Sequence, residues 1–312
     1  MDRRQKVLVM GASGNVGACV TRRLVERGDD VRVLLRRSSS TKGIDDVEVE
    51  RCYGDIFDTE AVVSAMADRD VVFYCVVDTR AHLADPAPLF STNVEGLRNV
   101  LDVAVNADLQ RFVFLSTIGT IAVGDDGATV DEETPFNWSG VAMCVSNPYG
   151  PPDWQPRQGA LVAMAAFGKL PVYVRGVGSE VVGIDDAAQA LILAAEHGRI
   201  GDRYIVSERY MSQREMLTTA AQAVGARPPR FGIPMAPLYA VGWLAGVSNR
   251  LFGTDFPMNL TAARLMWLTS PAGHSKATRD LGWKPAPTAE SIVRAARFYV
   301  DRKNRNEKVI EL

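Results

Sequence analysis

The chain has 312 residues, of which 47% are hydrophobic and 23% charged. This composition is typical of a globular protein with two small domains or one large domain and an added lobe. The net charge of −2 gives no electrostatic reason to expect a nucleic acid or an anionic membrane as a partner. The four cysteines lack C-x-x-C spacing and the three histidines are scattered. We therefore expect reduced thiols, a cytoplasmic protein and no metal site.

The first half of the chain alternates short apolar runs with helical patterns. Its amino terminus lacks the long apolar run of a signal peptide and is better used as a first strand. We expect strands at Lys6–Met10, Val31–Leu35, Val47–Cys52, Asp70–Val77 and Arg111–Ser116, and helices at Val16–Arg27, Glu60–Ala67 and Leu89–Asn106. The apolar runs are continuous, as in parallel strands covered on both faces. This pattern predicts a doubly wound parallel Rossmann sheet of the α/β class.

The second half is mixed in character. Several prolines follow Gly150, and helices are expected at Gln158–Phe167, at Gly183–His197 and from Ala289 onwards. Either Asp185 or Asp186 would cap the middle helix. A short strand begins at Arg203. We assign residues 1–147, with a contribution from about 181–200, to a dinucleotide-binding domain, and 148–312 mostly to a smaller substrate-binding lobe at the sheet's carboxyl edge.

The apolar segment Pro237–Val247 is too short to span a bilayer. A lid or core helix is the favoured interpretation, and a membrane-facing surface is the alternative. We expect no membrane span. A second group of apolar residues suggests a fairly apolar substrate, although such residues more often form core: Phe252, Phe256, Met258, Leu265, Met266 and Trp267.

A glycine-rich turn follows the first strand. It reads GASGNVG and opens a helix within a strand–helix–strand unit, which is the context in which such a motif binds a dinucleotide. Glycines let the backbone approach a pyrophosphate, and the helix amino terminus supplies N–H donors. The expected cofactor contacts here are Gly11, Ser13, Gly14, Asn15, Val16 and Gly17.

The end of the second strand indicates which nicotinamide dinucleotide binds. An NAD site usually has an acid there to hold the ribose 2′-hydroxyl, but this chain has Arg36 and Arg37 followed by Ser38–Ser40. Guanidinium groups with hydroxyls nearby suit a 2′-phosphate. The sequence therefore favours NADP over NAD.

Four further segments resemble motifs of the extended short-chain dehydrogenase/reductase superfamily, the NAD-dependent epimerase/dehydratase type. They are GDIFD from Gly54, TNVEGLRNVL from Thr92, NPYGPPDW from Asn147 and HSKATRDLGWKPAP from His274. The resemblance covers essentially the whole chain and is greatest to bacterial proteins similar to dihydroflavonol 4-reductase and 3β-hydroxysteroid dehydrogenase. It implies cofactor contacts at Asp55, Ile56, Val76, Val77 and Ser146, and a homodimer.

The resemblance also implies a catalytic hydroxyl, a Tyr and a Lys. The hydroxyl position falls on Thr117, with Ser116 beside it, and Asn93 matches a supporting helix asparagine. The Tyr passes a proton, and the Lys lowers its pKa, because a phenol that titrates near 10 is otherwise a poor base at neutral pH.

The Tyr and Lys should lie in a Y-x-x-x-K helix before the strand at Val141–Val145, and no such pair stands there. Neither Tyr149 nor Lys169 is a suitable substitute. Two explanations remain open: the natural polypeptide carries a helix near Gly140–Val141 that this sequence lacks, or the protein has lost it. The intact flanking motifs and the cost of a bare sheet face favour the first.

These observations favour an NADP-dependent oxidoreductase that interconverts a ketone and an alcohol on a small-to-medium apolar substrate. One alternative is a non-catalytic NADP(H)-binding regulator or scaffold. Another is a sugar-nucleotide epimerase or dehydratase, which would hold NAD tightly. Substrate identity and the direction of reaction cannot be derived from the sequence.

Overall fold

The computed structural model describes residues 4–80, 85, 87–117, 132, 141–154, 159–252, 271–305, 307 and 309. Its largest sheet has seven strands in the order β10-β6-β5-β4-β1-β2-β3, and every neighbouring pair is parallel. The strands are β1 (Lys6–Met10), β2 (Asp30–Leu35), β3 (Glu50–Tyr53), β4 (Val71–Tyr74), β5 (Arg111–Thr117), β6 (Val141–Val145) and β10 (Arg203–Val206). This confirms the predicted doubly wound parallel sheet.

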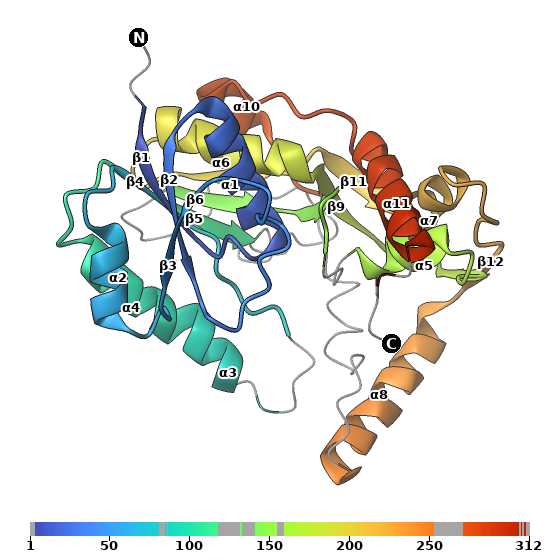
Figure 1. The fold of residues 1–312 in the computed structure, drawn as a ribbon. Helices are drawn as coiled ribbons and strands as arrows, with labels where there is room; N and C mark the ends of the chain where they lie inside the picture. Colours follow the sequence, from blue (N-terminus) through green and yellow to red (C-terminus); the bar gives the residue numbers. More distant parts are fainter. Residues whose placement is uncertain are drawn as a thin grey trace.

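Helices cover both faces of this sheet (Figure 1). One face carries α1 (Asn15–Arg27), α6 (Ile184–His197) and α10 (Ser275–Leu281), and the other carries α2 (Thr59–Met66) and α4 (Leu97–Ala104). Along β1, Val7 and Val9 pack into the hydrophobic core on the face of α1 and α6. Leu8 and Met10 pack into the core on the face of α2 and α4. Because alternate side chains enter different cores, the strand needs apolar residues at every position.

Some element ends differ from the predictions. β4 ends at Tyr74, three residues early, so Val76 and Val77 follow the strand. β3 begins at Glu50 rather than Val47. The long helix is three consecutive pieces: α3 (Ala87–Phe90), a π-helical turn at Ser91–Gly96, and α4.

The prediction that Asp185 or Asp186 caps α6 is wrong. The helix is capped by Gly183, with no side-chain cap hydrogen bond. Both acids lie in the first turn instead. Asp185 forms an ion pair with Arg294 (2.8 Å), and the Asp186 carboxylate accepts from the backbone N–H of Ala286 (3.3 Å). The acids thus attach α6 to the carboxyl-terminal part of the chain.

A smaller lobe lies beside the large sheet (Figure 1). Its three-stranded sheet has β9 (Gly178–Gly183) between β7 (Asn147–Tyr149) and β11 (Arg209–Ser212). The remaining elements are α5 (Ala160–Ala166), α7 (Gln213–Gln222), α8 (Met235–Phe252), α11 (Thr288–Asn304), and the paired short strands β8 (Val172–Val174) and β12 (Phe231–Ile233). The mixed character agrees with the prediction. The exact division into domains stays a prediction.

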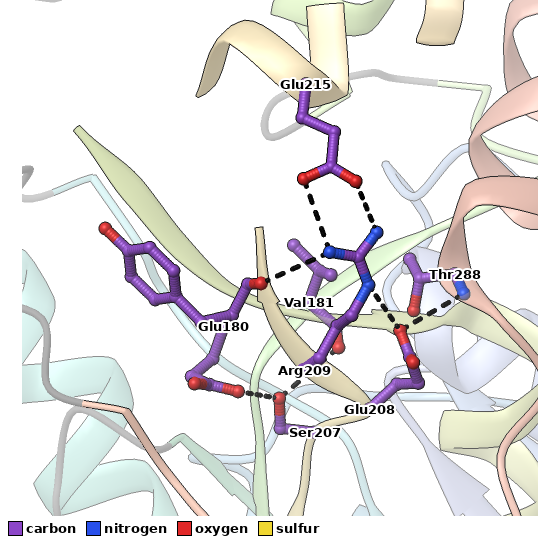
Figure 2. A network of polar contacts seen from close by, with 8 residues as sticks. Glu180, Val181, Ser207, Glu208, Arg209, Glu215 and Thr288 are labelled. Atoms are coloured by element: carbon purple, nitrogen blue, oxygen red, sulfur yellow. Dashed lines mark hydrogen bonds and ion pairs between the residues drawn. The ribbon is translucent and has the colours of Figure 1, made fainter. Parts of the chain in front are cut away.

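A polar network joins the strands and helices of this lobe (Figure 2). Buried Glu180 accepts a hydrogen bond from the hydroxyl of Ser207. Arg209 contacts Glu208 at 3.5 Å and Glu215 at 2.6 Å, and so connects β11 to α7. Glu208, Arg209 and Glu215 therefore each have a partner of opposite charge.

The cysteines are free thiols, and Cys19, Cys75 and Cys144 are buried, as predicted. Among the helices that the structure describes, none has the length and apolarity needed to cross a bilayer. Most residues of the group used to argue for an apolar substrate, from Phe256 to Trp267, lie outside the described residues.

Candidate dinucleotide-binding and active site

The glycine-rich turn after β1 brings three backbone segments together. Gly11 has φ +84°, and a Cβ there would lie 2.6 Å from the carbonyl carbon and oxygen of Cys75. A Cβ on Gly17 would overlap the carbonyl oxygen of Gly11. Only glycine therefore allows the end of β1, the start of α1 and the residue after β4 to approach this closely. Gly14 caps α1, and the first turn of α1 contains no acid to repel an anion.

A cleft of about 380 Å³ opens beside this turn, at the carboxyl ends of β1, β2 and β4. It is lined by seven of the predicted cofactor residues: Gly11, Ser13, Arg36, Asp55, Ile56, Val76 and Val77. Gly14, Asn15, Val16 and Gly17 form the adjoining turn and the start of α1. A larger cavity, of about 820 Å³, lies between α2 and α4 at the other end of the sheet and includes none of the predicted site residues.

The two arginines after β2 have different environments. Arg36 and Ser39 line the cleft, and the Ser39 N–H donates to the Arg36 carbonyl at 2.9 Å. Arg37 does not line it. Its guanidinium carbon lies 5.3 Å from the centre of the Tyr53 ring, a cation–π contact on the surface. The structure therefore places only one of the pair in the cleft.

The wall formed by Asp55 and Ile56 is fixed by local hydrogen bonds. The Asp55 carboxylate accepts from the N–H of Phe57 (3.2 Å), and the Asn99 amide donates to the Ile56 carbonyl (2.6 Å). Thr59 in turn donates to Asn99 at 2.8 Å. Ile56 is largely buried and lines the cleft, so it offers an apolar contact to a ligand there.

An ion pair that the sequence analysis missed lies at the cleft. Asp78 is buried and its carboxylate contacts the Arg80 guanidinium at 2.5 and 2.9 Å. The amide of Asn93 donates to the Asp78 carbonyl and accepts from its N–H, both at 2.8 Å. Asn93 therefore fixes the backbone after β4, and its supporting role in catalysis stays a prediction. An acid followed two residues later by a base, directly after an apolar strand, was the available signal.

Two polar atoms at this edge of the sheet are buried without a hydrogen-bond partner. They are Asn15 Oδ1, in the first turn of α1, and Ser146 Oγ, directly after β6. Such atoms are costly in a native structure unless a ligand or water completes them. A dinucleotide along the cleft would supply hydrogen-bonding groups, so the residues present fit such a cofactor.

The expected catalytic hydroxyls end β5. Ser116 is opposite Cys144 and exposed Thr117 opposite Val145 in the parallel pairing of β5 with β6. Both hydroxyls therefore lie at the same sheet edge as the cleft. The connection from β5 to β6 lies outside the described residues except for Glu132. The Glu132 carboxylate accepts from the Ile205 N–H at 2.9 Å, on the free edge of β10.

A Y-x-x-x-K spacing does occur once in the chain, at Tyr299 and Lys303, and sequence reasoning missed it. The structure excludes a catalytic role for this pair. Tyr299 is buried and donates to Asp153 at 2.6 Å, so burial and the carboxylate raise its pKa. Lys303 lies 4.7 Å from the Phe167 ring centre. Burial also raises the pKa of Tyr149 to about 12, which is the wrong direction for a general base.

The cysteine nearest the glycine turn is buried. Burial raises the pKa of Cys75, beside the glycine turn, to about 12, so it stays a thiol. No group of three described His, Cys, Asp or Glu residues could hold a metal ion. The site therefore offers backbone donors, hydroxyls and guanidinium groups, which suit a phosphorylated ligand.

Comparison with known proteins shows which family the chain resembles. The model of the NAD dependent epimerase/dehydratase family matches residues 7–139, the segment that holds the glycine turn, the cleft and β5. Over these residues the chain is similar to that family, and full-length relatives extend the similarity across the rest of the chain.

Individual relatives are more distant. The chain is 26% identical to sterol demethylase protein B of Methylococcus capsulatus, over 95% of this chain and 98% of that protein. It is 25% identical to a 3-beta-hydroxysteroid dehydrogenase of Mycolicibacterium neoaurum, over 95% and 92%. A Synechocystis protein provisionally named dihydroflavonol 4-reductase is 24% identical over 93% of each chain. These names confirm the predicted resemblance.

Solved structures show the same fold. A nucleoside-diphosphate-sugar epimerase from Pseudomonas aeruginosa superposes with a TM-score of 0.78 at 18% identity, over 96% of this chain and 99% of that one. The crystal structure of gox2253 superposes with a TM-score of 0.82 at 26% identity, over 97% and 100%.

Proposed function

We propose that this protein is an NADP-dependent oxidoreductase that interconverts a ketone and an alcohol on a small-to-medium apolar substrate. The observation that carries the proposal is the end of β2: Arg36 and Ser39 line the dinucleotide cleft, and no carboxylate occupies residues 36–43. An acid is usual there when the ribose carries a free 2′-hydroxyl. The steroid names of two relatives support an apolar substrate.

The residues of the cleft would bind and orient the cofactor. The glycine turn and the amino terminus of α1 would hold the pyrophosphate, and Arg36 with Ser39 would hold the 2′-phosphate. Ile56 would contact the adenine. When bound, the nicotinamide would supply or accept the hydride. Thr117, with Ser116 beside it, would donate a hydrogen bond to the substrate oxygen and so polarise the carbonyl.

The proton donor is the part of the proposal to test first. Residues 118–140 contain no Tyr and no Lys. The first measurement is therefore the intact mass of the protein purified from its natural source, against 34.0 kDa for this sequence. A mass heavier by roughly 2–3 kDa, about one helix and its connections, would mean that the natural protein has a further segment that can carry the missing Tyr–Lys pair.

Activity is then tested with NADPH and a panel of apolar ketones and aldehydes. Thr117→Val keeps the side-chain shape but removes the hydroxyl. We expect kcat to fall about 100-fold while NADPH affinity stays within about twofold. Equal turnover by the variant would exclude Thr117 from the chemistry.

Two alternatives predict different results. A regulator or scaffold would bind NADPH saturably and turn over no member of the panel. A sugar-nucleotide epimerase or dehydratase would copurify with tightly held NAD, and the epimerase fold of several neighbours keeps that reading open. A homodimer, which the resemblance implies, and a cytoplasmic location, which the cysteine pattern favours, belong to the same proposal.

A further inference from the structure

α8 and the residues before it form a surface that the proposed chemistry does not use. In Figure 1, α8 extends away from the rest of the smaller lobe. It has no extensive packing contact with any other helix or strand of the described chain. Only one of its 18 residues, Arg250, is charged. A helix this apolar is stable in water only if another part of the chain, a partner protein or an apolar phase covers it.

Two large aromatic side chains mark the surface. Phe231, in β12, is 68% exposed, and Trp243, in α8, is 59% exposed. Phe231 lies only three residues before the Pro234 that precedes the helix. Aromatic residues exposed on one segment of chain are typical of a surface that binds an apolar partner. We call residues 227–252 the α8 surface.

The charge of this region is opposite to that of the whole protein. Residues 216–254 contain Arg227, Arg230 and Arg250 and no Asp or Glu, whereas the chain has a net charge of −2. Arg227 and Arg230 are exposed, and within the described chain neither forms an ion pair. The α8 surface is therefore both apolar and cationic.

We propose that the α8 surface docks on an anionic lipid bilayer, with α8 lying in the plane of the headgroups. α8 is apolar, Trp243 on it is an exposed aromatic side chain, and Arg227 and Arg230 precede it, a combination that favours the surface of an anionic bilayer. The exposed arginines of two copies would repel each other, so self-association through this surface is disfavoured by charge. The proposal is independent of the oxidoreductase chemistry, because vesicle binding is measured without turnover.

The test is vesicle flotation with the full chain, using phosphatidylcholine vesicles with and without 30% phosphatidylglycerol. We expect binding to the anionic vesicles only, and weaker binding in 0.5 M NaCl. Trp243→Ala should weaken it about tenfold. Arg227→Glu combined with Arg230→Glu should weaken it roughly thirtyfold.

Matched controls are available elsewhere on the chain. Phe90→Ala removes an aromatic residue that is 63% exposed on α3, and Arg98→Glu reverses an exposed cation on α4. Both should bind like the unaltered protein. Circular dichroism and NADPH affinity show that every variant is folded.

The proposal is overturned if the folded protein fails to float with anionic vesicles, or if the α8-surface variants bind as well as the controls. It is also overturned if light scattering shows a dimer that Trp243→Ala dissociates, because a second copy would then cover the surface.

Discussion

The two halves of the candidate site are built in different ways. On the side of β1, β2 and β4, the expected cofactor contacts lie within a few residues of strand ends and depend on backbone geometry. On the side of β5 and β6, the expected chemistry depends on side chains from a connection of 23 residues, 118–140, that lacks Tyr and Lys. Nucleotide binding can therefore be inferred from short local sequence, whereas catalysis cannot. The predictions below test whether the two halves are separable.

The largest effect is expected at Gly17, on the nucleotide side. Alanine is the better helix former by about 1 kcal/mol, so propensity alone predicts that Gly17→Ala stabilises α1. Its Cβ would instead overlap the carbonyl oxygen of Gly11. We expect the turn to be displaced and NADPH affinity to fall at least 100-fold in a fluorescence titration.

Gly273→Ala is the matched control, because a Cβ there meets no atom within 4 Å. It should leave NADPH affinity unchanged. If Gly17→Ala folds and binds NADPH normally, the turn does not hold the pyrophosphate and the assignment of the whole nucleotide side is wrong.

Asp78 tests the boundary between the halves. Asp78→Asn keeps the size of the side chain but removes the charge that holds Arg80, and it leaves a guanidinium beside a neutral amide. Because Asp78 is buried, we expect the free energy of unfolding to fall by about 2 kcal/mol. Urea denaturation measures it.

The exposed pair of Arg22 and Asp46 gives the comparison, since the Asp46 side chain is 68% exposed. Asp46→Asn should change stability by no more than about 0.5 kcal/mol. Equal effects of the two substitutions would mean that burial does not strengthen the Asp78 pair.

Sequence reasoning succeeded where a single physical requirement fixes the outcome. The apolar runs around Val7–Val9 predicted the parallel strands, and GASGNVG predicted the turn, because only glycine fits it. It failed where contacts with other segments of the chain decide which way a side chain is held. The Asp78–Arg80 pair depends on a loop conformation fixed by Asn93. The Arg37 guanidinium packs on the Tyr53 ring instead of lining the cleft. Residue spacing offered a signal for the Asp78–Arg80 pair but none for the contact of Arg37 with Tyr53.

Arg36 and Arg37 sharpen the distinction between adjacent residues of the same type. We expect Arg36→Ala to weaken NADPH binding about tenfold and to leave NADH binding within about twofold, because it removes one charge-assisted contact to the 2′-phosphate. Arg37→Ala should affect neither, since its guanidinium stacks on Tyr53. Isothermal titration of all four combinations measures the difference. A reversed result would place Arg37 in the phosphate site.

The smallest expected effect lies in the other lobe, at Glu180. Burial raises the pKa of this carboxyl above its usual value of 4.5, although hydrogen bonds from Ser207 and the Ala272 N–H oppose the shift. A raised folded-state pKa means that the native state binds the proton more tightly than the unfolded state. The stabilisation is therefore complete below pH 4.5 and is lost as the pH rises through the folded-state value.

Glu180→Gln removes this titration while keeping the shape of the side chain. The difference in unfolding free energy between the unaltered protein and the variant, measured in denaturant titrations, should fall as the pH rises from 4.5. Glu26→Gln, at an exposed position on α1, is the matched surface substitution. A pH-independent difference for Glu180→Gln would mean that the hydrogen bonds compensate burial in full. NADPH affinity should not change, because Glu180 does not line the dinucleotide cleft. If affinity changes with the protonation of Glu180, the smaller lobe and the dinucleotide cleft are coupled through β9.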